Sequence, residues 1–289
     1  MYTIENEILK VVIKSTGAEL DSIYNKNTKL EYMWNADPAF WSKKSPVLFP
    51  IVGTLKNDTY YFQGQPYSLS RHGFAREMDF TVTDQKPGTI TFSLENNDAT
   101  YAKYPFSFRF NITYRILSNR LTVTYDILNT GSGQMLFSVG GHPAFKVPLT
   151  DNTVYTDYYL EFDKAENTGR WPISQDGLIE KTPQPLLNNS KKISLTKELF
   201  YKDALVFKNL DSNKVSLLSD KTTHGLEFDF NEFPYLGIWA AKNADFVCIE
   251  PWCGIADNVD TNQQLVNKEG INALDANKSF ERSWTAKFF

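Results

Sequence analysis

Apolar and polar residues alternate with a period of two along much of the chain. The clearest run is apolar at every second position from Phe106 to Ile116, with serine, asparagine, threonine and arginine residues between. The alternation resumes from Leu121 to Ile127, after residues 117–120. Successive side chains of a strand point to opposite faces, so this pattern predicts two strands joined by a tight turn, each with one buried face.

Shorter runs of the same kind recur along the chain, whereas helical periodicity is nearly absent. The further strand signals lie at residues 9–13, 90–94, 215–217, 226–230 and 284–288. Two short helices are predicted, at residues 98–104 with Asn97 or Asp98 as the cap, and at residues 196–200. Many short strands separated by turns predict an all-β sandwich or barrel. No repeat or linker divides the chain, so one domain spanning residues 1–289 is expected.

Two segments are predicted to lie outside the strands. Residues 167–192 are polar and rich in glycine and proline, which indicates a long loop on one face. His224, in Thr222-Thr223-His224-Gly225, is expected in a solvated hairpin turn between two strands. Neither segment is interpreted as a domain boundary.

The composition limits the kinds of partner that the protein can have. Aromatic residues make up 15% of the chain, which suits a β-rich core and also suits the apolar faces of sugars. The net charge is −4 and the basic residues are scattered, so nucleic acid and anionic lipid are not expected partners. The expected ligand is small, and neutral or only locally charged; the sequence indicates no oligomeric state.

Short segments of the sequence indicate where the protein is expected to be located and whether metal or nucleotide sites are expected. Residues 1–7 lack the features of a signal peptide, and no apolar run reaches the ~18 residues that span a bilayer, so a cytoplasmic protein is expected. Cys248 and Cys253 have only carboxylates near them in the sequence, which argues against zinc. Free thiols are favoured over a Cys-x4-Cys disulfide in a reducing cytosol. No Walker, Gly-x-Gly-x-x-Gly or Gly-x-Ser-x-Gly motif is present.

His142 and Glu250 are the strongest candidates for chemistry. His142 follows two glycines at the end of an apolar strand and precedes a proline, which presents its side chain at a strand end. Glu250 interrupts the apolar run 246–252, where a carboxylate is costly to bury unless it is paired. A histidine and a carboxylate in one cleft can move protons at neutral pH. A hydrogen-bonded structural histidine and a structural salt bridge remain the alternative interpretation.

Other residues have weaker signals. His72 lies in a His-Gly turn, for which a structural role is favoured. Asp203 either caps a strand or points into a cleft and binds hydroxyl groups. Trp239 and Trp252 are typical of a core, and either can also form a ligand platform.

Four strings in this order resemble the aldose 1-epimerase (galactose mutarotase-like) family, and its LacX-like bacterial branch most of all. They are Arg71-His72-Gly73-Phe74, Gly140-Gly141-His142-Pro143, Asp203-Ala204-Leu205-Val206-Phe207 and Cys248-Ile249-Glu250-Pro251-Trp252. The resemblance covers essentially the whole chain. It implies a β-supersandwich of large twisted antiparallel sheets with an open sugar cleft, no metal and no organic cofactor.

The resemblance also implies roles for single residues. His142 matches the general acid and Glu250 the general base, while His72 and Asp203 match residues that hold sugar hydroxyls. Thr54 stands where many members have an arginine that contacts the sugar, and Arg76 is the candidate to replace that cation. A carboxylate field from Asp203 or Glu250 is expected to keep His142 protonated.

Three functions therefore follow as expectations. The first is an aldose 1-epimerase (mutarotase) of carbohydrate metabolism that acts on a free hexose such as galactose or glucose. The second is a hexose-6-phosphate 1-epimerase, which needs at least two cations near the cleft; Arg71, Arg76 and Lys56 are the available ones. The third is a non-catalytic sugar-binding or sensing protein that keeps the site without turnover.

Overall fold

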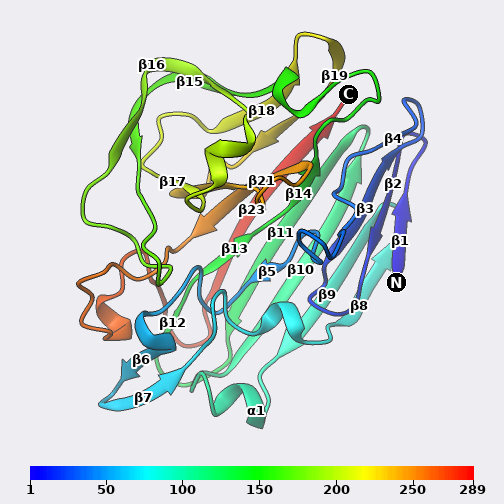
Figure 1. Cartoon of the computed structure of the whole chain (residues 1–289). Helices are drawn as coiled ribbons and strands as arrows, with labels where there is room; N and C mark the ends of the chain where they lie inside the picture. Colours follow the sequence, from blue (N-terminus) through cyan, green and yellow to red (C-terminus); the bar gives the residue numbers. More distant parts are fainter.

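The computed structural model describes all 289 residues, and strands dominate it (Figure 1). The largest sheet has nine antiparallel strands. Across the sheet they are β16 (Gln184–Ser194), β15 (Tyr158–Arg170), β18 (Lys214–Ser219), β19 (Thr222–Asp229), β23 (Ser279–Phe288), β11 (Arg120–Asn129), β10 (Phe108–Leu117), β9 (Thr89–Glu95) and β8 (Thr81–Lys86).

The second sheet has six strands and carries the candidate chemistry. Its strands are β17 (Leu205–Lys208), β20 (Tyr235–Trp239), β21 (Phe246–Cys253), β13 (Val139–Gly141) and β5 (Val47–Leu48), with β14 (Ala144–Lys146) also paired to β21. A third, N-terminal sheet contains β1 (Tyr2–Glu5), β2 (Leu9–Ile13), β3 (Leu20–Asn25) and β4 (Leu30–Glu31).

The remaining elements are short. Two pairs of strands complete the sheet structure: β6 (Thr59–Phe62) with β7 (Gln65–Ser68), and β12 (Met135–Phe137) with β22 (Asn272–Leu274). The helices are α1 (Asp98–Tyr101) and the 3₁₀ turns η1 (Lys56–Asp58), η2 (Ala75–Glu77), η3 (Tyr155–Asp157), η4 (Lys197–Phe200) and η5 (Leu265–Asn267). None of these helices has the length and apolar character that crossing a membrane requires.

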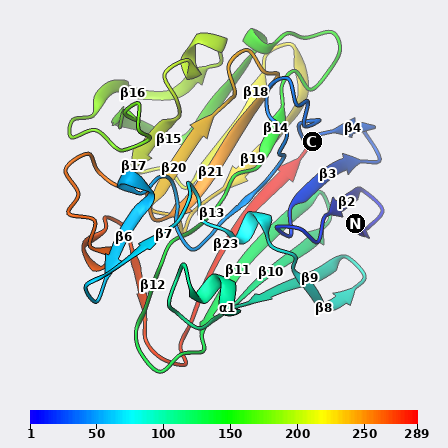
Figure 2. The same cartoon turned by 60° about the horizontal axis from the view of Figure 1, so that its bottom comes forward.

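Figures 1 and 2 show the smaller sheets beside the nine-stranded sheet, and apolar side chains form the contacts between them. Phe145 of β14 lies with its ring centroid 5.9 Å from that of Phe228 in β19. The ring centroid of Tyr2, in the N-terminal sheet, lies 5.4 Å from that of Phe92 in β9. The main core contains 70 buried residues, drawn from the sheets and from the segments between them. The predicted all-β supersandwich of large antiparallel sheets is thus confirmed, while the extent of the domain stays a prediction.

Most predicted strands are present at the predicted places. β10 and β11 form the expected hairpin, and Ser118 in its turn has a φ of 54°. α1 is shorter than predicted, and its cap is Asn97, whose side chain accepts the Thr100 N–H at 3.0 Å. The helix predicted at residues 196–200 is the 3₁₀ turn η4.

Two loop predictions were wrong. Half of residues 167–192 belongs to the hairpin of β15 and β16, and the predicted loop is limited to residues 171–183, which connect those strands. β16 is an edge strand with little buried surface, so its sequence lacks alternation and tolerates Pro185. His224 lies within β19, because Ser219 pairs with Thr222 and the turn needs only residues 220–221.

A buried ion pair fixes the loops at one end of the six-stranded sheet. Lys268 Nζ lies 2.8 Å from Asp257 Oδ1, with both side chains at most 3% exposed. The other carboxylate oxygen of Asp257 accepts the Lys56 N–H at 3.0 Å. The backbone of Asp257 also bonds Thr54 and Ile179, so three chain segments meet at this residue.

Asp257→Ala is expected to lower the free energy of unfolding by roughly 3–5 kcal/mol, because it leaves the Lys268 ammonium buried without a partner. Urea denaturation would measure the loss. Asp260→Ala is the matched control: its partner Lys181 is also 2.9 Å away, but both side chains are more than half exposed, so a loss under ~1 kcal/mol is expected. Equal losses in the two variants would contradict the argument.

Candidate active site

The strand register places His142 directly opposite Glu250. β13 and β14 pair with the same strand, β21, and residues 142–143 interrupt them. β14 pairs Ala144 with Cys248, so the antiparallel register brings His142 opposite Glu250, where side chains share a face. His142 Nε2 lies 3.3 Å from Glu250 Oε2, and the two residues are 8% and 2% exposed.

Two glycines, Gly237 and Gly140, leave the space that the Trp252 indole occupies. Gly237 of β20 pairs with Glu250 from the other side of β21. A Cβ at Gly237 would lie 2.4 Å from the ring of Trp252, and one at Gly140 would lie 2.8 Å from it. The absent side chains let Trp252 lie across the adjacent strands beside the carboxylate. Its indole nitrogen is buried and has no hydrogen-bond partner.

His72 is held by a tight turn against the segment that follows β5. Its Nδ1 accepts the Gly53 N–H at 3.1 Å, which leaves Nε2 to carry the proton of the neutral ring. Its φ is 69°, a left-handed conformation that costs energy in a non-glycine residue and that is held here by this hydrogen bond and by the His72 N–H bond to the Gly53 carbonyl at 2.9 Å. The His72 ring meets the His142 ring edge-on, with centroids 5.7 Å apart.

A carboxylate and two guanidinium groups line the same cavity. Asp203 follows η4 with a φ of 85°, and its Oδ1 accepts the Ala204 N–H at 2.7 Å. Arg71 lies 3.5 Å from that carboxylate. Arg76 has a distant ion pair with Glu77 at 3.8 Å, and its buried Nε has no hydrogen-bond partner. The Arg76 guanidinium therefore keeps donors free for a ligand.

Two further tryptophans line the site. Trp41 stacks on His142 with centroids 5.0 Å apart, and its carbonyl accepts the indole N–H of Trp34 at 2.9 Å. Trp239, at the end of β20, meets the His142 ring edge-on at 5.5 Å. These rings exclude water from the imidazole and offer apolar faces to a ligand.

All five site residues predicted from the sequence, His72, Arg76, His142, Asp203 and Glu250, line one cavity of about 310 Å³. Two positions discussed with them lie outside it. Lys56 donates its ammonium to the Val259 carbonyl at 2.8 Å. Thr54 packs against Gly177, where an added Cβ would lie 2.6 Å from the threonine hydroxyl.

Burial disfavours charge on both members of the central pair. Burial lowers the pKa of His142 to about 3, with Arg71 and Arg76 adding to the effect. Burial also raises the pKa of Glu250 well above its usual range; Arg71 opposes this shift and Asp203 adds to it. The expectation of a protonated His142 is therefore wrong for this structure, in which burial outweighs the carboxylate field. Burial therefore favours the neutral form of both side chains.

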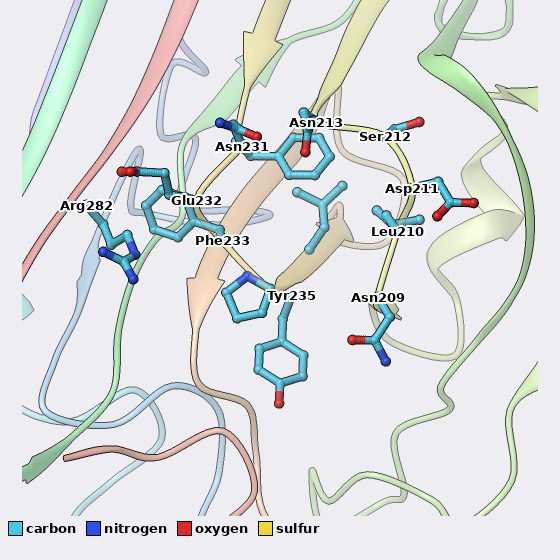
Figure 3. Close-up of a pocket in the computed structure, with 13 residues that line it drawn as sticks. Asn209, Leu210, Asp211, Ser212, Asn213, Asn231, Glu232, Phe233, Tyr235 and Arg282 are labelled. Atoms are coloured by element: carbon cyan, nitrogen blue, oxygen red, sulfur yellow. The ribbon is translucent and has the colours of Figure 1, made fainter.

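A larger cavity of about 580 Å³ lies elsewhere, between residues 209–213 and 230–236 (Figure 3). Amide side chains, including those of Asn209 and Asn231, surround it, but it contains no histidine. Its carboxylate residues, Asp211 and Glu232, are exposed. The smaller cavity, with buried ionisable groups of shifted pKa, is the better candidate for chemistry.

The two thiols lie near this site but cannot pair. Cys248 and Cys253 are both free and buried. They are five residues apart on β21 and point to opposite faces, and at ~3.3 Å per residue their Cα atoms exceed disulfide distance. Only Cys248 faces the catalytic candidates.

The fold is an all-β supersandwich with a buried histidine–glutamate pair among tryptophans, and comparison with known proteins identifies the family. Residues 1–266 match the family model described as aldose 1-epimerase. The chain belongs to the aldose 1-epimerase family.

Individual relatives agree with this membership. The chain is 33% identical to the chromosomal protein LacX of Lactococcus lactis subsp. lactis, over 94% of this chain and 93% of that protein. A galactose mutarotase related enzyme from Lactobacillus acidophilus has a similar structure, with a TM-score of 0.95 and 38% identity over 100% of this chain and 97% of that one. A galactose mutarotase-like protein from Lactobacillus casei ATCC 334 has a TM-score of 0.94 and 31% identity, with both chains fully covered.

The sequence alone did not indicate Trp41 and gave only a partial signal for Arg71. Trp41 lies in a segment between β4 and β5 that has no periodicity, so nothing in the pattern places it over His142. Arg71 was considered only as one possible phosphate ligand. The sequence signal for Arg71 as a site residue was its position beside His72, in a turn that the fold brings to the site.

Glu250→Gln is expected to stabilise the fold at pH 7. The pKa of Glu250 is raised on folding, so the unfolded chain loses this proton near the ordinary value of 4.5 while the folded chain keeps it. Stability therefore falls as the pH rises above about 4.5, and glutamine removes that loss.

Thermal melts at pH 4 and pH 7 would measure the effect. The expected gain at pH 7 is at least ~2 °C, roughly 1 kcal/mol for a chain of this size, and it vanishes at pH 4. Glu281→Gln, at an exposed position, is the control and should show no such dependence. Destabilisation at both pH values would instead mark Glu250 as a structural group.

Proposed function

We propose that this protein is an aldose 1-epimerase that interconverts the α and β anomers of a hexose, with His142 as general acid and Glu250 as general base. One observation supports this most strongly: the 3.3 Å approach of two buried proton-transfer groups within a cavity lined by three tryptophans. The galactose mutarotase descriptions of similar structures support the same reaction.

The spacing of the pair suits the reaction. Anomer exchange removes a proton from the anomeric hydroxyl and adds one to the ring oxygen, and both oxygens are bonded to the same carbon. The base and the acid must therefore lie close together, as Glu250 and His142 do. Ring opening breaks the bond between C1 and the ring oxygen, the C1–C2 bond rotates, and closure reverses both proton transfers.

One shared proton is sufficient for this cycle. Opening starts with the proton on His142 and ends with a proton on Glu250, and closure uses the two groups in exchanged roles. The neutral pair that burial favours is thus the state that ring opening produces. The polar groups of a bound sugar would favour the ionised state, from which opening begins.

The surrounding groups provide recognition. The His72 Nε2–H, the Asp203 carboxylate and the Arg76 guanidinium would bind sugar hydroxyls, and Trp41, Trp239 and Trp252 would cover apolar ring faces. Galactose and glucose are the substrates that we propose first. We propose the cytoplasm as the location, where two buried thiols can remain reduced.

His142→Ala and Glu250→Gln should each slow turnover about 10²–10⁴-fold, because each removes a proton-transfer group. The measurement is polarimetry or NMR on freshly dissolved α-D-galactose and α-D-glucose. Thermal melts of both variants serve as the folding control. Unchanged turnover in folded variants would exclude these roles, and calorimetric sugar binding without any turnover would favour a non-catalytic sugar-binding protein.

A hexose-6-phosphate is the second candidate substrate, and one specific observation favours it. Arg71 and Arg76 both line the cavity, and Arg76 has unused donors. A phosphate accepts several charge-assisted hydrogen bonds, so two guanidinium groups suit it better than a hydroxyl.

Arg76→Gln is expected to lower kcat/KM for glucose 6-phosphate about ten- to hundredfold, as the loss of a hydrogen bond to a charged group implies. The ratio of kcat/KM for glucose 6-phosphate and glucose is the decisive quantity. Arg115→Gln, on an exposed position of β10, is the control. A ratio that Arg76→Gln leaves unchanged would exclude the phosphorylated substrate.

A further inference from the structure

Three different metal-ligating side chains converge in the active site. Cys248 and Glu250 are two residues apart on β21 and therefore share a face. His142, opposite Glu250, joins them from the interruption between β13 and β14. Their donor atoms all lie within 4.8 Å of one another, and all three residues are buried.

This donor set has the chemistry of a zinc site. Zinc takes thiolate, imidazole and carboxylate ligands at about 2.0–2.3 Å, and sites with three protein ligands keep a fourth position open. Displacements of the donor atoms by roughly 1 Å would bring all three onto one ion at these bond lengths. The fourth position would face the cavity, where water or a sugar hydroxyl completes the coordination.

The fold brings a histidine beside Cys248, which has no histidine near it in the sequence. Near Cys248 in the sequence only carboxylates are available, which is why no metal is expected from spacing alone. Sheet pairing adds His142, more than a hundred residues earlier in the chain. A metal here would not serve the proposed reaction, because the ion would occupy the same nitrogen and oxygen atoms that transfer protons.

We propose that His142, Cys248 and Glu250 form an inhibitory site for Zn²⁺, in which the ion blocks the acid–base pair. Binding needs the Cys248 thiolate, so the thiol proton leaves to water as the Zn–S bond forms, with no change of oxidation state. The inhibition rests on the proposed epimerase function, whereas the metal binding does not.

Co²⁺ is the direct probe of the site, because cobalt bound to a thiolate in tetrahedral geometry absorbs in both the near-ultraviolet and the visible. Adding CoCl₂ to the full chain should produce both absorptions at one equivalent. Cys248→Ala should lose the near-ultraviolet band. Cys248→Ser serves if the alanine variant melts early, since its hydroxyl is a poor zinc ligand.

Cys253→Ala is the matched control. Cys253 is also a buried free thiol of β21, but it points to the opposite face, with its sulfur 3.8 Å from the Glu232 carbonyl. This variant should keep the cobalt spectrum of the native protein. Loss of the spectrum in Cys253→Ala together with its retention in Cys248→Ala would overturn the assignment.

Zinc inhibition completes the test. ZnCl₂ should inhibit sugar epimerisation, and Cys248→Ala should raise the inhibition constant at least tenfold while changing turnover without zinc less than about threefold. Inhibition of equal strength in both proteins would overturn the proposal, as would cobalt binding without thiolate absorption. If no sugar is epimerised, the cobalt spectrum still decides the metal site, so failure of the two proposals can be distinguished.

Discussion

The pairing of β21 with β13 and β14 is the constraint on which the site depends. One antiparallel register brings His142 opposite Glu250 and Gly140 opposite Trp252. A shift of that register by one residue would turn Glu250 to the other face of the strand and separate the pair. Because β21 is buried along its whole length, its apolar side chains hold the register strongly. The precision of the site is thus a property of sheet packing rather than of flexible loops.

Burial of β21 also determines how readily Glu250 is ionised. A carboxylate within a fully buried strand would destabilise the fold if it were ionised and alone, and a neighbouring imidazole limits that cost by sharing a proton. Arg71 and Arg76 both lower the pKa of His142, and Arg71 also acts on Glu250, yet both guanidinium groups remain partly exposed. The site therefore combines a dry centre, where protons can move over a short distance, with a polar rim, where hydroxyls can be recognised.

The sequence predicted the individual strands better than it predicted which distant segments lie next to each other. Alternation predicted the β10–β11 hairpin because one face of each strand is buried, whereas β16 has little buried surface and escaped notice. His72, His142 and Glu250 were recognised because each lies beside glycine or proline, whereas Asp203 and Arg76 were recognised from the family resemblance. Trp41 and the alignment of Cys248 with His142 depend on contacts between distant segments, which no local pattern encodes.

The contact between Thr54 and Gly177 has an evolutionary consequence. Gly177 has a φ of 78°, and its missing side chain makes room for the threonine hydroxyl. An arginine at position 54 would meet the backbone of the loop 171–183, so this larger side chain would also require that loop to change. Positions 54 and 177 are in this sense epistatic: a larger side chain at either position meets the residue at the other. A change of side-chain size at one of the two positions is therefore tolerated best when the other position changes with it.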